Sequence, residues 1–365
     1  MRRSRYTAVA VQSQHSWAGA LADVLHLTDG ASVTRVAVAR CLLVASALRV
    51  ALSAVARRVA AVGRETVRKA LAGDLPRDRD TLERHLAAGF RRHLPRSFQE
   101  HPIPIAIDTH ARPFYGDYEN TPGVVGGKPK DGAKWFWGYA TAVALVPGHR
   151  HTLGLTAMCP GDTPDALVER LLAQLGWAGV KVRYVLLDRG FYSARVANAL
   201  ARRQLRFIIP MVRRGKAVQP LFRRGTRGWF EHTIRCRKCR ADSATVRVAV
   251  VPGHDGRRPL VFACSDGFDR LPRVVLEYRT RFGIETSYRQ LGECLARTTS
   301  DDPVYRLLLV GVSLLIRAWW MAGGTGTLAT TRWDLIIIFT PNTATATTTG
   351  PMAQTPAATE LPNTP

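Results

Sequence analysis

The chain has 365 residues, of which 46% are hydrophobic and 22% are charged. This length and composition exclude a short binding peptide and fit a soluble protein of two or three domains. Lysine and arginine number 52 against 28 aspartate and glutamate residues, which leaves a net charge of +24. Such an excess favours a polyanionic partner such as DNA, and a merely basic surface is the alternative.

Two features bear on where the protein resides. The apolar stretch at 7–11 is too short for a signal peptide, and the apolar run 304–320 contains two arginines and is short for a membrane span. The 6 cysteines are scattered along the chain, which fits free thiols in a reducing compartment better than a disulfide framework. We therefore expect a cytoplasmic, nucleoid-associated protein without a membrane segment.

Residues 1–98 are expected to form an all-helical DNA-binding domain, because apolar positions recur there at helical spacing. Within it, 50–72 has the form of a helix-turn-helix, with a first helix rich in small residues and a basic second helix. This interpretation places Arg64, Arg68 and Lys69 against DNA. An ordinary helical hairpin whose arginines are solvated is the alternative.

Residues 99–211 change to short apolar segments that are typical of strands, separated by two helical patterns. Strands are expected at 103–108, 135–146, 152–158, 182–187 and 206–209, and helices at 165–174 and 193–203. This order indicates an α/β protein with a mixed sheet and flanking helices.

The rest of the chain divides into three parts. Residues 212–270 contain short strand patterns among many glycines and arginines and are expected to form a β-rich insertion. Residues 271–320 return to helix and complete the core. The composition of 321–365 shifts to Gly, Thr, Ala and Pro, which predicts a disordered or truncated tail.

Three acidic residues stand where such a sheet would gather them. Asp108 follows an apolar run, where a charge without a partner would be costly. Asp188 ends a second apolar run, and parallel strands present ligands at their carboxyl ends. With Glu285 from a later helix, they would hold two Mg²⁺ or Mn²⁺ ions, which promote in-line displacement at a phosphodiester. We therefore predict that Asp108, Asp188 and Glu285 are the metal-binding and catalytic residues.

The segment around Glu285 adds a second pattern. Tyr278, Arg281 and Glu285 are spaced i, i+3 and i+7, so they share one face of a helix. A tyrosine and an arginine beside a metal-binding carboxylate would grip the phosphate backbone next to the scissile bond. A solvated amphipathic helix is the alternative.

These segments resemble the motifs of DDE transposases of the insertion sequence 4 family. The segment 278–289, YRTRFGIETSYR, resembles their Y-x2-R-x3-E signature, 187–192 resembles the motif around their second aspartate, and 107–109 resembles the first. The resemblance covers about 103–320. It departs from the family at Gly292, where a lysine commonly follows the glutamate by seven residues.

The resemblance implies a ribonuclease-H-like catalytic core, dependence on Mg²⁺ or Mn²⁺, and cut-and-paste strand transfer at terminal inverted repeats. The expected partners are double-stranded DNA of the repeats and of the target, bound by a homodimer that synapses two ends. We expect Arg189 and Arg289 to contact DNA as well. Trp229 would stack on a base displaced near the cut, with core packing as the alternative.

Two other functions are compatible with the same sequence. One is a nuclease or resolvase of the same fold that does not transfer strands, and the other is a non-catalytic helix-turn-helix protein derived from a decayed transposase. Cys236 and Cys239 form a Cys-x2-Cys half-site for zinc, although free thiols are the simpler interpretation because a convincing second pair is missing. The terminal repeats, the target sequence and the transposition intermediate are not encoded in any recognisable pattern.

Overall fold

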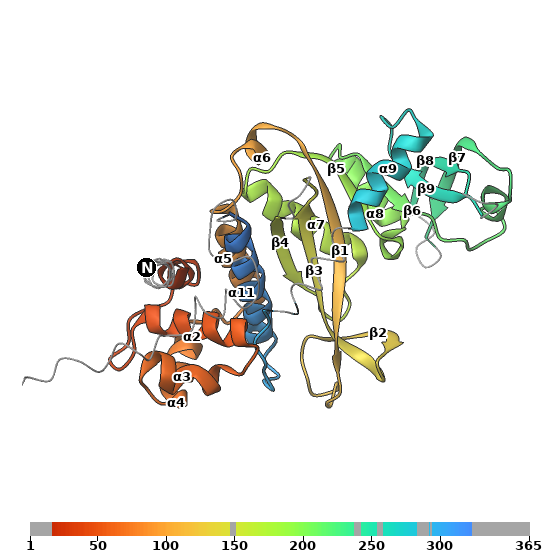
Figure 1. The fold of residues 1–365 in the computed structure, drawn as a ribbon. Helices are drawn as coiled ribbons and strands as arrows, with labels where there is room; N and C mark the ends of the chain where they lie inside the picture. The colour runs from red at the N-terminus through yellow and green to blue at the C-terminus, as the bar shows by residue number, and fades with distance from the viewer. Residues whose placement is uncertain are drawn as a thin grey trace, which may run out of the picture.

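The computed structural model describes residues 17–146, 151–236, 242–253, 258–282, 292 and 294–322. Figure 1 shows a cluster of helices at one end, a long sheet in the middle, and a group of strands with one helix at the other end. The first cluster comprises α2 (Arg35–Leu48), α3 (Leu52–Ala60), α4 (Arg64–Asp74), α5 (Arg79–Arg91) and the distant α11 (Pro303–Ala322), whereas the short α6 (Ser97–Glu100) buries Phe98 in the core of the sheet.

The helix α11 returns from far along the chain to pack against α2 and α5. Leu42, Phe90 and Leu315, one from each of these helices, are completely buried in one core. The same core includes Trp137 and Tyr139 of the sheet. The N-terminal helices are therefore joined to the sheet through a continuous apolar interior, in which their stability comes mainly from packing.

Helices occupy the segment that was expected to form a helix-turn-helix. The first helix, α3, ends at Ala61, which adopts a left-handed conformation with φ of 54°. Gly63 then precedes α4. Val55 and Val67 are buried in the common core, so the two helices present their apolar sides inward and their arginines outward.

Among the described residues, nine strands form a single sheet. They are β1 (Ile103–Phe114), β2 (Val124–Lys130), β3 (Ala133–Ala144), β4 (Thr152–Ala157), β5 (Val182–Leu187), β6 (Phe207–Pro210), β7 (Gly228–Arg235), β8 (Ser243–Val251) and β9 (Leu260–Cys264). The order is β2-β3-β1-β5-β6-β9-β8-β7, with β4 also paired to β3. Strands β1, β5 and β6 run parallel, whereas β3, β4 and β9 pair antiparallel with their neighbours. This mixed α/β arrangement is consistent with the ribonuclease-H-like expectation.

Helices cover the two faces of the sheet differently. On one face, α7 (Pro164–Trp177) and α8 (Ala194–Arg202) pack on a cluster that contains Ile107 and Leu187. On the other face, α9 (Leu271–Arg279) packs on a cluster that contains Ala106 and Leu186. Successive residues of β1 and β5 thus point to opposite faces, as the pleat requires.

Three details of the sheet differ from the sequence-based expectation. Strand β1 does not end at Asp108 but continues to Phe114, because its second half pairs with β3 as far as Trp135. The strands β2 and β7 were not expected, and β2 contains two glycines, a proline and mostly exposed positions that hide its pattern. The strands of the segment 212–270 extend the central sheet through the pairing of β6 with β9.

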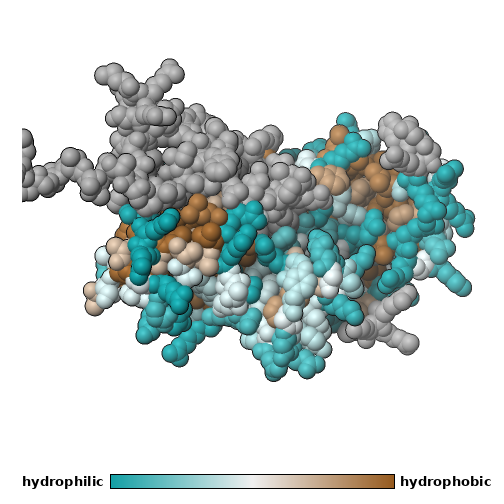
Figure 2. All heavy atoms as spheres, turned by 60° about the horizontal axis from the view of Figure 1, so that its bottom comes forward, coloured by the Kyte–Doolittle hydropathy of each residue, from teal (hydrophilic) through white to brown (hydrophobic). Residues whose placement is uncertain are grey.

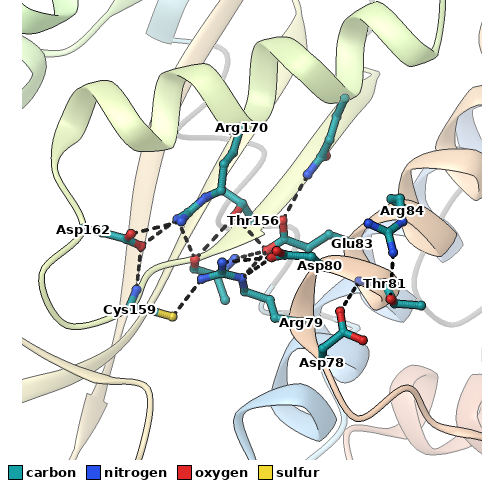
Figure 3. Close-up of polar contacts among 12 residues, drawn as sticks. Asp78, Arg79, Asp80, Thr81, Glu83, Arg84, Thr156, Cys159, Asp162 and Arg170 are labelled. Carbon is teal, nitrogen blue, oxygen red and sulfur yellow. Dashed lines mark hydrogen bonds and ion pairs between the residues drawn. The ribbon is translucent and has the colours of Figure 1, made fainter.

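A buried carboxylate ties α5 to the sheet and to α7 (Figure 3). Glu83, which is only 4% exposed, accepts hydrogen bonds from the Thr156 hydroxyl at 2.7 Å and the Ala157 amide at 2.9 Å. Its other oxygen accepts one from the Gln174 side chain at 3.3 Å. Burial raises the pKa of Glu83 to about 6, against the opposite effect of these donors and of Arg79. The three donors fix where α5 lies on β4.

The surface of the molecule carries both hydrophilic and hydrophobic side chains. On the coloured part of the surface in Figure 2, hydrophilic side chains predominate, with hydrophobic patches among them. No helix in the described part of the chain combines the length and the apolar character needed to cross a bilayer.

Candidate active site

Two of the three predicted acidic residues lie side by side at the centre of the sheet. In the parallel pairing of β1 with β5, Ile107 is opposite Leu187. Asp108 and Asp188 are the next residues of each strand, and neighbouring strands lie about 5 Å apart. Since Ala106 and Leu186 face α9, the alternation of side chains places both carboxylates toward that same face.

Asp108 is buried and paired. It is 7% exposed, and its Oδ2 lies 2.9 Å from Nη2 of Arg281, which is equally buried on the short helix η4 (Thr280–Phe282). Its Oδ1 accepts a hydrogen bond from the Thr109 amide at 2.9 Å. A carboxylate in this position requires such a partner, because an uncompensated charge inside the protein is strongly unfavourable.

Asp188 is held by the turn that follows β5. Its Oδ1 accepts a hydrogen bond from the Gly190 amide at 2.8 Å, so that it caps the short helix η1 (Arg189–Phe191). A Cβ atom on Gly190 would lie 3.0 Å from that oxygen, which explains why glycine suits this position. The Asp188 carboxylate is only half-buried and is therefore more accessible than Asp108.

Tyr278 lies over both carboxylates. Burial raises the pKa of its hydroxyl to about 12. Beyond burial, Arg281 and Arg189 lower this pKa, and Asp188 and Asp108 raise it. All four charged groups therefore lie within electrostatic reach of one hydroxyl.

The helix that carries Tyr278 is firmly attached to the sheet. Val274 is completely buried, and the ring of Tyr278 lies 5.0 Å from that of Phe262, centre to centre. The Tyr184 hydroxyl donates a hydrogen bond to Glu277. The sequence spacing of Tyr278 and Arg281 thus brings both to the carboxylates, although Arg281 lies on η4, just past the end of α9.

The third carboxylate, Glu285, lies outside the described residues, as does Arg289. Within the described ranges, no group of three Asp, Glu, His or Cys side chains converges on one point. The oxygen donors of Asp108 and Asp188 are the hard ligands that Mg²⁺ and Mn²⁺ prefer. The two residues therefore fit a divalent cation in their chemistry, with a further ligand required to complete a site.

The other expected DNA contacts are spread over the molecule. Arg189 is exposed on η1, next to Asp188. Arg64 and Lys69 are exposed on α4, whereas Arg68 forms an ion pair of 2.6 Å with Glu65. Arg64, Arg68 and Lys69 are thus exposed to solvent on α4, the helix that was expected to contact DNA.

Trp229 and the cysteine half-site occupy the far strands. Trp229 packs, partly buried, against the cluster under α9, and the Arg247 guanidinium lies 4.3 Å from the centre of its ring. This arrangement agrees with the core-packing alternative. Cys236 is half-buried, and Cys239 lies outside the described residues.

Arg112 was missed by the sequence analysis. It lies four residues beyond Asp108 in β1, on the same face of the sheet, opposite Trp137 of β3. The expected strand ended at Asp108, so the alternation was not followed into the polar residues beyond it. A strand drawn to Phe114 would have placed Arg112 on the side of the carboxylates.

The comparisons with known proteins agree with the fold. No family model matches the chain, and no curated protein matches it. A solved structure that resembles it is the cryo-EM structure of a piggyBac transposase synaptic complex with hairpin DNA, with a TM-score of 0.52 and 12% sequence identity. The match covers 90% of this chain and 76% of that one. The chain therefore shares its fold with a known transposase over most of its length.

Proposed function

We propose that this protein is a DNA transposase of the DDE type, related to the insertion sequence 4 family, which cleaves DNA and transfers its strands. The observation that carries the proposal is the placement of Asp108, within β1, beside Asp188, just past the end of the parallel strand β5, close to Tyr278 and Arg281. Acidic residues from distant segments converge in this way where a metal ion is bound for phosphodiester chemistry.

Two further observations favour DNA as the substrate. The net charge of +24 suits a polyanion, and the fold is that of a transposase whose structure was determined as a synaptic complex with hairpin DNA. By analogy, we propose that this chain binds the ends of its element as a homodimer. Arg64, Arg68 and Lys69 of α4 would contribute to that binding.

In the proposed mechanism, Asp108, Asp188 and Glu285 would hold Mg²⁺ or Mn²⁺, and the bound metal would supply charge stabilisation for displacement at the phosphodiester. Arg281 orients Asp108 through Nη2, and its buried Nε has no hydrogen-bond partner among the described residues. That N–H is a donor suited to a phosphate oxygen. Tyr278 carries its proton at neutral pH, as tyrosine ordinarily does, and its pKa of about 12 extends this state to higher pH, so its hydroxyl can donate to the same phosphate.

A single substitution tests the catalytic assignment. Asp188→Asn preserves shape and removes the charge of a half-buried side chain, so folding and DNA binding should persist. Mg²⁺-dependent cleavage of DNA that carries the element's own ends should fall about a thousandfold, which corresponds to the several kcal/mol that metal ligation contributes. Asp269→Asn, at an exposed aspartate, is the matched control and should leave cleavage unchanged. Cleavage by Asp188→Asn at the wild-type rate would refute the assignment.

The products of the same reaction separate a transposase from a nuclease. A transposase joins the cleaved ends to a target plasmid, whereas a nuclease of this fold leaves them free. We expect joined products with a short target duplication. Cleavage without any joining would favour the nuclease.

A further inference from the structure

A second charged site lies beyond the carboxylates on the same face of the sheet. It is a cavity of about 450 Å³ between β1, β3, the loop 294–299 and α11. Four arginines line it: Arg49, Arg112, Arg297 and Arg306. We call it the arginine cavity.

The positive charge of the arginine cavity is only partly balanced within the described structure, where Asp301 lies within electrostatic reach of Arg306. No aspartate or glutamate is among its described lining residues, and none of its arginines takes part in an ion pair between described residues. Arg306 is fixed by a hydrogen bond from Nε to the Ser300 carbonyl at 2.5 Å and by the Trp137 ring, 4.6 Å away. Arg49 and Arg297 are exposed, whereas Arg112 and Arg306 are half-buried, so an anion in the cavity would offset the charge of two partly desolvated cations.

Arg112 experiences this imbalance most directly. Burial lowers the pKa of its guanidinium, Tyr139 acts in the opposite direction, and Arg49 and Arg306 lower it further. Three guanidinium groups are therefore close enough to repel one another. A guanidinium stays charged even so, since its pKa is far above neutrality.

The distance between the arginine cavity and the carboxylates suits a phosphate of a DNA strand. Asp108 and Arg112 are four residues apart on one side of β1, or about 13 Å at the rise of a strand. A DNA strand advances about 3.4 Å per nucleotide along its axis. Because phosphates of one strand also wind around this axis, a strand with one phosphate at the carboxylates can place another at the arginine cavity about two nucleotides away.

We propose that the arginine cavity binds a backbone phosphate of the DNA strand that is engaged at Asp108 and Asp188. The inference rests on the proposed function, and it assigns Arg49, Arg112, Arg297 and Arg306 as the residues that position this strand. Guanidinium groups suit this role because they bind phosphate oxygens in pairs.

The test measures DNA affinity against salt concentration. A fluorescein-labelled random-sequence duplex is titrated with the full-length chain at several KCl concentrations, and anisotropy gives the dissociation constant. Arg112→Gln should reduce the slope of log affinity against log salt by about one and weaken binding about tenfold at low salt. Arg112→Lys should retain the slope because it retains the charge. Arg202→Gln, at an exposed arginine of α8 that forms a surface ion pair with Glu169, should change neither the slope nor the affinity.

Unfolding of the Arg112→Gln variant in urea shows whether Arg112 binds DNA or only stabilises the fold. Removing one of several mutually repelling cations should leave the Arg112→Gln variant at least as stable as the wild type. A variant that unfolds at lower urea and loses binding in parallel would overturn the inference, as would a wild-type salt slope. If the slope is unchanged while Asp188→Asn abolishes cleavage, this inference fails alone. If Arg112→Gln behaves as expected while Asp188→Asn still cleaves, the catalytic assignment fails alone, and a wild-type chain that binds no DNA refutes both.

Discussion

Two buried acidic residues beside the same sheet are held by different sets of partners. Glu83 is 4% exposed and Asp108 is 7% exposed, so burial does not distinguish them. Glu83 accepts hydrogen bonds from Thr156, Ala157 and Gln174 of the strand and helix against which α5 packs, and it lies 3.5 Å from Arg79 of its own helix. Asp108 instead pairs with Arg281 from a distant segment, next to a second carboxylate that is partly open to solvent.

The difference shows that the surroundings of a buried carboxylate decide its role. The donors around Glu83 all come from the elements that this carboxylate joins, which are α5, β4 and α7 (Figure 3). Around Asp108, Arg281 and Arg189 bring positive charge beside two carboxylates near Tyr278. Charges of both signs gathered from separate segments are typical of functional sites, whereas a carboxylate whose donors all lie in the elements packed around it is typical of structural ones.

The largest expected effect on stability comes from breaking the pair between Asp108 and Arg281. Both side chains are about 10% exposed or less, so Arg281→Gln leaves a buried carboxylate without its cation. We expect the free energy of unfolding to fall by about 3–5 kcal/mol, measured by urea denaturation in EDTA. Added Mg²⁺ should recover part of this loss if Asp108 is a metal ligand, because ligands stabilise the state that binds them.

A pair on the surface provides the control. Arg68 and Glu65 are separated by 2.6 Å, but their side chains are more than half exposed. Arg68→Gln should therefore have little effect on unfolding. If Arg281→Gln lowered the free energy of unfolding as little as Arg68→Gln, the ion pair with Arg281 would not be what stabilises the buried Asp108 carboxylate.

A smaller effect on the free energy of unfolding is expected from the titration of Glu83, and it depends on pH. Its pKa is about 6 in the folded protein against an ordinary value of 4.5, so the folded state binds the proton more tightly than the unfolded chain. This contribution to stability is complete below about pH 4.5 and is lost as the pH rises to about 6. The loss corresponds to about 2 kcal/mol.

Glu83→Gln isolates this contribution, since glutamine does not titrate. The difference in unfolding free energy between wild type and variant should change across this pH range and be constant above it. A constant difference from pH 4 to pH 8 would show that Glu83 titrates normally, contrary to its buried position.

The smallest expected effect is on the rate of DNA cleavage, when the Tyr278 hydroxyl is removed. Tyr278→Phe removes one hydroxyl and preserves the ring that packs on Phe262. Stability should be nearly unchanged, whereas cleavage should slow by about fivefold to tenfold, which corresponds to the roughly 1 kcal/mol that one typical hydrogen bond contributes. Unchanged cleavage would remove Tyr278 from the site and leave it a packing role.

Local patterns in the sequence predicted much of the fold. The strand at 182–187 was predicted with the bounds that the structure gives it, and the two helices at 165–174 and 193–203 lie where their apolar spacing placed them. Continuous apolar runs bounded by polar residues carry this information locally. By contrast, β2 and the second half of β1 depend on pairing with β3, which no local pattern records.

The site was predictable in part for the same reason. Asp108 and Asp188 follow apolar strands, so their meeting required only that the two strands be parallel neighbours. The arginine cavity was not predictable, because Arg49, Arg112, Arg297 and Arg306 come from four separate segments that only the packing of α11 brings together. A high arginine content hides such a cluster among many solvated residues.

The most direct test of the central claim is to locate a metal ion between the carboxylates of Asp108 and Asp188. Crystals of the full-length chain would be soaked in MnCl₂, and anomalous scattering would be recorded near the manganese edge. The proposed site predicts a peak about 2.1 Å from carboxylate oxygens of both Asp108 and Asp188. A well-ordered map without a peak between these two residues, or with manganese bound only elsewhere, would contradict it.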